Sequence, residues 1–80
     1  FNPGTRIDYQ IFSSGYTTLT IFNMRGENVR TVFKSIRSAG SYSSFWNGTD
    51  NSGKPLPSGN YFYQLKNNEM VKIKKMILLK

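Results

Sequence analysis

The stretch Thr5-Arg6-Ile7-Asp8-Tyr9-Gln10-Ile11 alternates apolar and polar side chains along its whole length. Such alternation is typical of a β-strand with one buried and one solvated face, because successive side chains of a strand point to opposite faces. Ile7, Tyr9 and Ile11 would then face a core, and the polar residues between them would face water. The segment therefore predicts a half-buried strand.

Similar segments recur along the chain, separated by residues that favour turns. The expected strands cover residues 5–11, 17–23, 28–34, 42–47, 60–66 and 70–80. The longest separation runs from Gly48 to Gly59 and holds three Gly and two Pro, which is typical of a surface loop. No window keeps a helical apolar period. We therefore expect an all-β fold, an antiparallel β-sandwich of about seven short strands, with the long loop crossing between its sheets.

Composition limits the chemistry that this chain can perform. Its 80 residues contain 11 Lys and Arg, four Asp and Glu, no His and no Cys, which gives a net charge of +7. Disulfides, thiolate nucleophiles and the usual neutral-pH proton shuttle are thus excluded, and the acids are scattered. We expect one domain over residues 1–80, no enzymatic activity, no cofactor, no metal ion and no transmembrane segment. The positive charge calls for an anionic partner.

Several aromatic and polar motifs could serve either the packing of the fold or the binding of a ligand. Trp46 and the triplet Tyr61-Phe62-Tyr63 contain side chains that stack on sugars or bases elsewhere. Core packing is the expectation for both, and alternation places Phe62 opposite the two tyrosines, so the triplet forms no continuous patch. Asp50-Asn51-Ser52-Gly53 resembles the start of a calcium loop but lacks its later bidentate acid, so we expect a turn.

Lysine is concentrated near the end of the chain. Five of the 11 cations fall in the last two expected strands, at Lys66, Lys72, Lys74, Lys75 and Lys80. Alternation places Lys72 and Lys74 on the face of Met70, and Lys75 on the opposite face. Lysines on an edge strand often prevent aggregation between sheets. The alternative is a docking surface for an anionic or protein partner, and the sequence leaves both open.

Four segments together resemble a known family: Phe1-Asn2-Pro3-Gly4-Thr5, Trp46-Asn47-Gly48-Thr49-Asp50 with Gly53-Lys54-Pro55, Pro57-Ser58-Gly59-Asn60-Tyr61-Phe62-Tyr63-Gln64-Leu65, and Lys74-Lys75-Met76-Ile77-Leu78-Leu79-Lys80. In this order, they resemble the type A C-terminal sorting domain of cargo proteins of the type IX secretion system. That family is itself similar to the Ig-like domain of the flagellar hook-capping protein.

The resemblance implies a non-catalytic Ig-like sandwich that ends a larger secreted protein. Such a domain directs its upstream cargo through the periplasm and across the outer membrane, to the cell surface or beyond. Its partners would be the outer-membrane secretion and sortase machinery, the cargo domain and possible anionic lipopolysaccharide. The residues that we expect the translocon or sortase to recognise are Lys74, Lys75, Met76, Ile77, Leu78, Leu79 and Lys80. Gly48, Gly53 and Gly59 would shape the loop that presents them, and residues 1–5 would follow a linker to the cargo.

Other functions stay open at this stage. The chain is also compatible with an Ig-like module of a flagellar hook-capping scaffold, which would assemble with hook subunits. A carbohydrate-binding accessory module would use Trp46 or the tyrosines and would need at least two exposed, coplanar aromatic rings. A nucleic-acid binder ranks lower, because the cation cluster is lysine only and lacks interleaved aromatic or Arg side chains.

Overall fold

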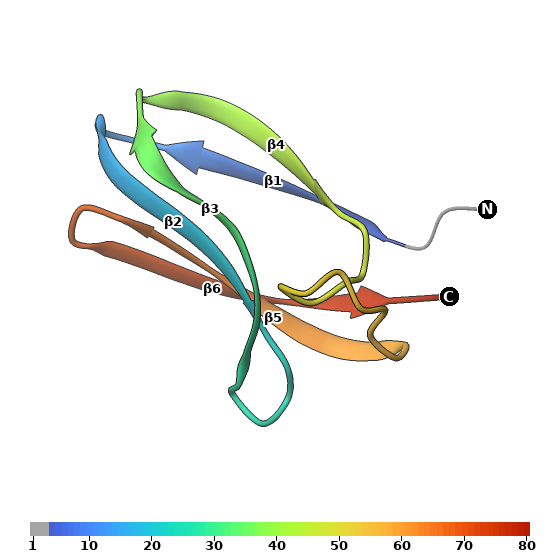
Figure 1. The fold of residues 1–80 in the computed structure, drawn as a ribbon. Helices are drawn as coiled ribbons and strands as arrows, with labels where there is room; N and C mark the ends of the chain where they lie inside the picture. Colours follow the sequence, from blue (N-terminus) through green and yellow to red (C-terminus); the bar gives the residue numbers. More distant parts are fainter. Residues whose placement is uncertain (1–3) are drawn as a thin grey trace.

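The computed structural model describes residues 4–80, which form six antiparallel strands (Figure 1). The strands are β1 (Thr5–Ile11), β2 (Gly15–Phe22), β3 (Asn28–Arg37), β4 (Gly40–Trp46), β5 (Gly59–Asn67) and β6 (Met70–Leu78). The expected all-β sandwich is therefore confirmed, with six strands instead of about seven. Phe1, Asn2 and Pro3, which we expect to follow a linker, lie outside the described residues.

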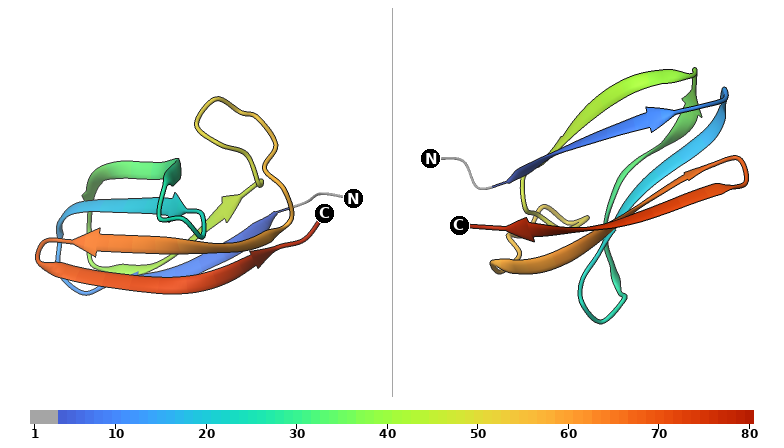
Figure 2. Two further views of the ribbon diagram at one scale, coloured as in Figure 1. Left: turned by 90° about the horizontal axis from the view of Figure 1, so that it is seen from below. Right: turned by 180° about the vertical axis from the view of Figure 1, so that it is seen from behind.

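The strands form two sheets of unequal size (Figure 2). One is a ribbon of β1 and β4, and the other has four strands in the order β3-β2-β5-β6. The connection from β4 to β5 crosses from the small sheet to the large one, as the punctuated loop predicts. Strands β2 and β5 pair although they are distant in sequence, with Leu19 opposite Leu65.

One face of each sheet supplies the core. Ile7, Tyr9 and Ile11 of β1 are buried, as their alternation predicts, and they pack with the inward residues of β2 and β5. Trp46 at the end of β4 meets Tyr61 of β5 edge to face, with ring centroids 5.2 Å apart. Aromatic pairs in this geometry add stability beyond the apolar area that they bury, which helps a domain of this size.

The last strand lies at the edge of the large sheet. Its nine residues pair with β5 on one side, from Gly59 opposite Leu78 to Asn67 opposite Met70. No strand of residues 4–80 pairs with its other side. The sequence left the position of this strand open, and the structure places it at an edge.

Candidate interaction site

Strand β6 presents two chemically different faces. Lys72 lies opposite Leu65 and Lys74 opposite Tyr63, so both lysines share the core-facing side of the sheet. Both lysines are nevertheless exposed. Val71 and Ile73 point to the outer side, where Ile73 is 59% exposed. The expected division of lysines between the two faces is confirmed.

The segment expected to be recognised by secretion machinery alternates between buried and exposed positions. Lys74, Lys75 and Ile77 are exposed, Met76 is half-buried, and Leu78 is fully buried with 0% exposure. Leu79 and Lys80 follow the strand and are exposed, and the Lys80 N–H donates to Ser58 Oγ at 3.1 Å. Leu78 thus belongs to the core, and the remaining side chains of the segment are accessible to different degrees.

The three glycines expected to shape the loop have different surroundings. Gly48 is buried with φ +80°, and a Cβ placed on it would lie 3.1 and 3.2 Å from the two methyl carbons of Leu78. Gly53 has φ +83° in an exposed turn, and its N–H donates to the Asp50 carbonyl at 2.9 Å. Gly59 begins β5. The structure therefore brings the loop and the terminal strand together at Gly48, and not at Gly53.

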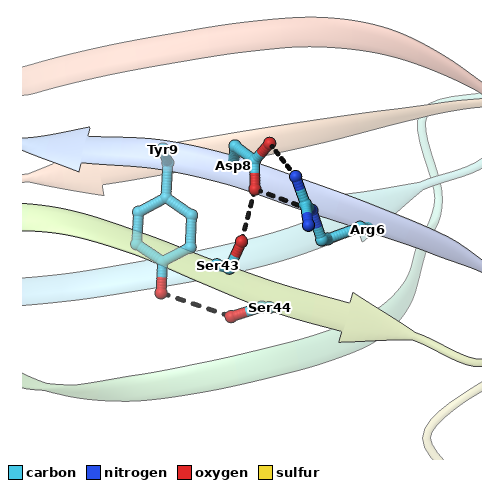
Figure 3. A network of polar contacts seen from close by, with 5 residues as sticks. All are labelled: Arg6, Asp8, Tyr9, Ser43 and Ser44. Carbon is cyan, nitrogen blue, oxygen red and sulfur yellow. Dashed lines mark hydrogen bonds and ion pairs between the residues drawn. The ribbon is translucent and has the colours of Figure 1, made fainter.

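The lysines of the last two strands have no carboxylate partner among residues 4–80. Among residues 4–80, the ion pair that forms is between Arg6 and Asp8 of β1, with Nε and Oδ1 3.1 Å apart (Figure 3). A short hydrogen bond from Ser43 and the neighbouring Arg6 hold the pKa of Asp8 below its usual value of 3.8. Lys72 lines the same shallow polar hollow of about 570 Å³ as Asp8, without an ion pair to it.

Three of the aromatic residues considered for ligand stacking, Trp46, Tyr61 and Tyr63, are buried, and Phe62 is half-buried. Trp46 is 2% exposed, and its Nε1–H donates to the Thr49 carbonyl at 2.9 Å. Tyr61 and Tyr63 are also buried, and burial raises the pKa of both phenols. These rings offer no exposed platform, so the carbohydrate-binding alternative loses the residues on which it was based.

The long loop covers the outer edge of β3, a contact that the sequence did not predict. Asn51 of the long loop bonds to the backbone of β3: its N–H donates to the Val29 carbonyl at 3.0 Å, and its Oδ1 accepts from the Thr31 N–H at 2.8 Å. The Arg30 guanidinium adds a bond to the Asp50 carbonyl at 2.7 Å. The Asx-type turn was the available signal, but it did not indicate which strand the turn would cover.

Chemistry of other kinds finds little support in the described residues. Within residues 4–80 there is no group of three or more acidic side chains placed to hold a metal ion. The same residues contain no helix with the length and apolar character needed to cross a membrane. The feature that stands out is instead an edge strand with exposed lysines and aliphatic side chains.

Six antiparallel strands in two layers around a buried tryptophan define an Ig-like β-sandwich. More particularly, the chain belongs to the FlgD Ig-like domain family, whose model matches residues 8–69. The matched region ends just before β6. None of the curated proteins that were compared matches the chain.

Solved structures of FlgD proteins share this fold. FlgD from P. aeruginosa is similar with a TM-score of 0.73 and 20% identity, over 94% of this chain and 60% of that one. Truncated FlgD from the human pathogen Helicobacter pylori gives a TM-score of 0.60 and 19% identity, over 98% of this chain and 62% of that one. The chain thus spans about 60% of the length of these proteins.

Proposed function

We propose that this chain is a non-catalytic Ig-like docking module of a scaffold protein of the hook-capping type. Membership of the FlgD Ig-like domain family carries the proposal. The free edge of β6 supports a role in contacts with other proteins, because an unpaired strand edge is a ready site for pairing. This was the alternative reading of the sequence, and the family match favours it over the sorting function.

Replacement of this domain tests the scaffold function. In a flagellated host that carries the encoded protein, residues 5–78 are exchanged for an unrelated Ig-like domain of similar size. We expect hooks to be lost or aberrant in electron micrographs, while the exchanged protein is still produced. Normal hooks in normal number would contradict a scaffold role for this domain.

A second candidate is the type IX sorting signal, because most side chains of the segment that resembles such signals, residues 74–80, are exposed. Its partners would be the outer-membrane secretion and sortase machinery, with anionic lipopolysaccharide as a further contact. The protein would then pass through the periplasm to the cell surface.

The sorting candidate requires a variant that keeps the core intact. Residues 1–80 are fused to an exported reporter in a host that uses type IX secretion, and surface delivery is measured by protease accessibility. Ile77→Ser with Leu79→Ser changes exposed side chains but leaves Leu78 in place. Phe12→Ser, at an exposed site in another part of the fold, is the matched control. Sorting predicts that the tail variant stays in the periplasm and the control reaches the surface. Equal delivery of both would exclude tail recognition.

A further inference from the structure

The two edges of the large sheet differ in what lies against them. At β3, Asn51 bonds to Val29 and Thr31 and takes backbone positions that an added strand would use. At β6, no hydrogen bond from a loop of residues 4–80 reaches the strand backbone. The left view of Figure 2 shows the same asymmetry, with the long loop rising on the side of β3 and with β6 at the opposite edge of the sheet. One edge is covered, and the other is open along nine residues.

From Val71 to Lys74, the side chains of the open edge alternate in chemistry as well as in direction. Lys72 and Lys74 project on the core-facing side and are exposed, and Lys72 borders the hollow that Asp8 of β1 also lines. Val71, Ile73 and Ile77 project on the outer side and are each more than half exposed, and the exposed Lys75 lies between Ile73 and Ile77 on that side. A neighbouring strand would meet two cations on the core-facing side, and on the outer side it would meet aliphatic side chains with one further cation.

We propose that the free edge of β6 binds an extended acidic segment of another protein, which adds to the large sheet as a fifth strand. Side chains directly opposite each other on paired strands lie about 5 Å apart at Cβ. Carboxylates at two alternate positions of the segment would therefore pair with Lys72 and Lys74, and the apolar residue between them would pack beside Ile73. Backbone bonds supply affinity in this mode, and alternate side chains supply specificity.

Charge selects this occupant over a second copy of the chain. The protein carries a net charge of +7, and the two lysines have no ion pair among residues 4–80. Antiparallel pairing of two β6 strands centred on Ile73 would set Lys72 of one copy opposite Lys74 of the other, and like charges in that position repel. A lipid surface would meet the lysines but would offer no N–H and C=O groups in strand register.

The inference rests on the docking function proposed above and names its surface and the partner's chemistry. Its probe is a capped peptide, Ac-Thr-Val-Glu-Val-Glu-Val-Thr-NH₂, titrated against the 80-residue chain and followed by NMR. We expect saturable binding that weakens with salt, and slower amide exchange along β6. Lys72→Gln with Lys74→Gln should weaken binding by about five- to tenfold, which corresponds to about 0.5–0.7 kcal/mol for each of the two exposed ion pairs.

Two controls separate strand addition from general attraction to a basic protein. Lys34→Gln with Lys54→Gln removes the same charge from exposed sites away from β6, and should change the affinity by less than about twofold. A peptide with the same side chains but N-methylated at alternate residues should not bind. Equal binding of the methylated peptide, or equal losses from both lysine pairs, would overturn the proposal. So would stronger binding to phosphatidylglycerol vesicles than to the unmodified peptide.

Failure of this inference differs from failure of the docking function itself. If the domain exchange abolishes assembly but the Lys72 and Lys74 variant assembles normally, the docking function stands and this surface is wrong. If the exchange leaves assembly intact, the docking function fails whatever the peptide does.

Discussion

Gly48 packs against Leu78, so a buried contact joins the start of the long loop to the end of β6. The loop holds Gly48 at φ +80°, and the side of the residue where a Cβ would stand is filled by the two Leu78 methyl groups. Within the loop, the Leu56 N–H donates to the Gly48 carbonyl at 2.8 Å. The crossing between the sheets and the end of β6 are therefore coupled through direct packing.

Gly48→Ala should destabilise the domain by about 1–3 kcal/mol. The new Cβ would lie tighter against Leu78 than ordinary contacts allow, and a non-glycine residue at this φ carries a cost of about 1–2 kcal/mol on its own. The measurement is the free energy of unfolding in urea. Gly53→Ala is the matched control, since Gly53 has φ +83° but no atom within 4 Å of the added Cβ. If both variants lose equal stability, the contact with Leu78 contributes nothing.

Leu78→Ala should cost about 2–5 kcal/mol, the range seen when a buried leucine is truncated and leaves a cavity. Leu78 is fully buried at the last position of β6. Leu79→Ala, at a side chain that is 71% exposed, should change stability by less than about 0.5 kcal/mol. Leu78→Ala removes a large part of the stability of a small domain and could leave it unfolded. Leu78→Met is therefore the milder variant, which should stay folded and lose less than about 1.5 kcal/mol. A neutral Leu78→Ala would place the end of β6 outside the cooperative core.

The sequence predicts the fold class because alternation is a local property. Ile7, Tyr9 and Ile11 are buried where their spacing places them, and Lys72 and Lys74 share the face that their numbering indicates. Strand length is less local: β3 continues beyond the expected end to Arg37 because Gly15 and Tyr16 of β2 extend the ladder opposite it.

The edge and its cover could not be predicted from the sequence. The pairing of β2 with β5 fixes the order of the large sheet, and it joins segments more than 40 residues apart, such as Leu19 and Leu65. Asn51 reads as a turn residue by composition, and only the folded chain brings it to Thr31. The candidate site depends on both of these non-local contacts, since they decide which edge stays open.

Asn51→Ala should expose part of the β3 edge. The variant loses the bond from the Thr31 N–H to Asn51 Oδ1, which is exposed and is expected to contribute about 0.5–1.5 kcal/mol. Amide hydrogen exchange at Thr31 should therefore become about two- to tenfold faster. Ser52→Ala is the control, because Ser52 donates to Asp50 Oδ1 with its backbone N–H, which the substitution keeps. Unchanged exchange at Thr31 would show that the loop backbone protects the edge without the Asn51 side chain.

The Asp8 carboxyl should titrate below 3.8, because a hydrogen bond from Ser43 and contacts with Arg6 favour its charged form. Ser43→Ala and Arg6→Gln should each raise the pKa of Asp8 toward that value in an NMR titration of the carboxyl carbon.

A carboxyl whose pKa is lowered by folding stabilises the fold above its unfolded pKa and loses that contribution as the pH falls through the folded value. Stability of the native chain should therefore decline below pH 3.8 more steeply than that of Asp8→Asn. The same substitution should lower the pKa of Tyr63, which burial raises most and the negative charge of Asp8 raises further. An Asp8 pKa at or above 3.8 would show that the Ser43 and Arg6 contacts do not persist in solution.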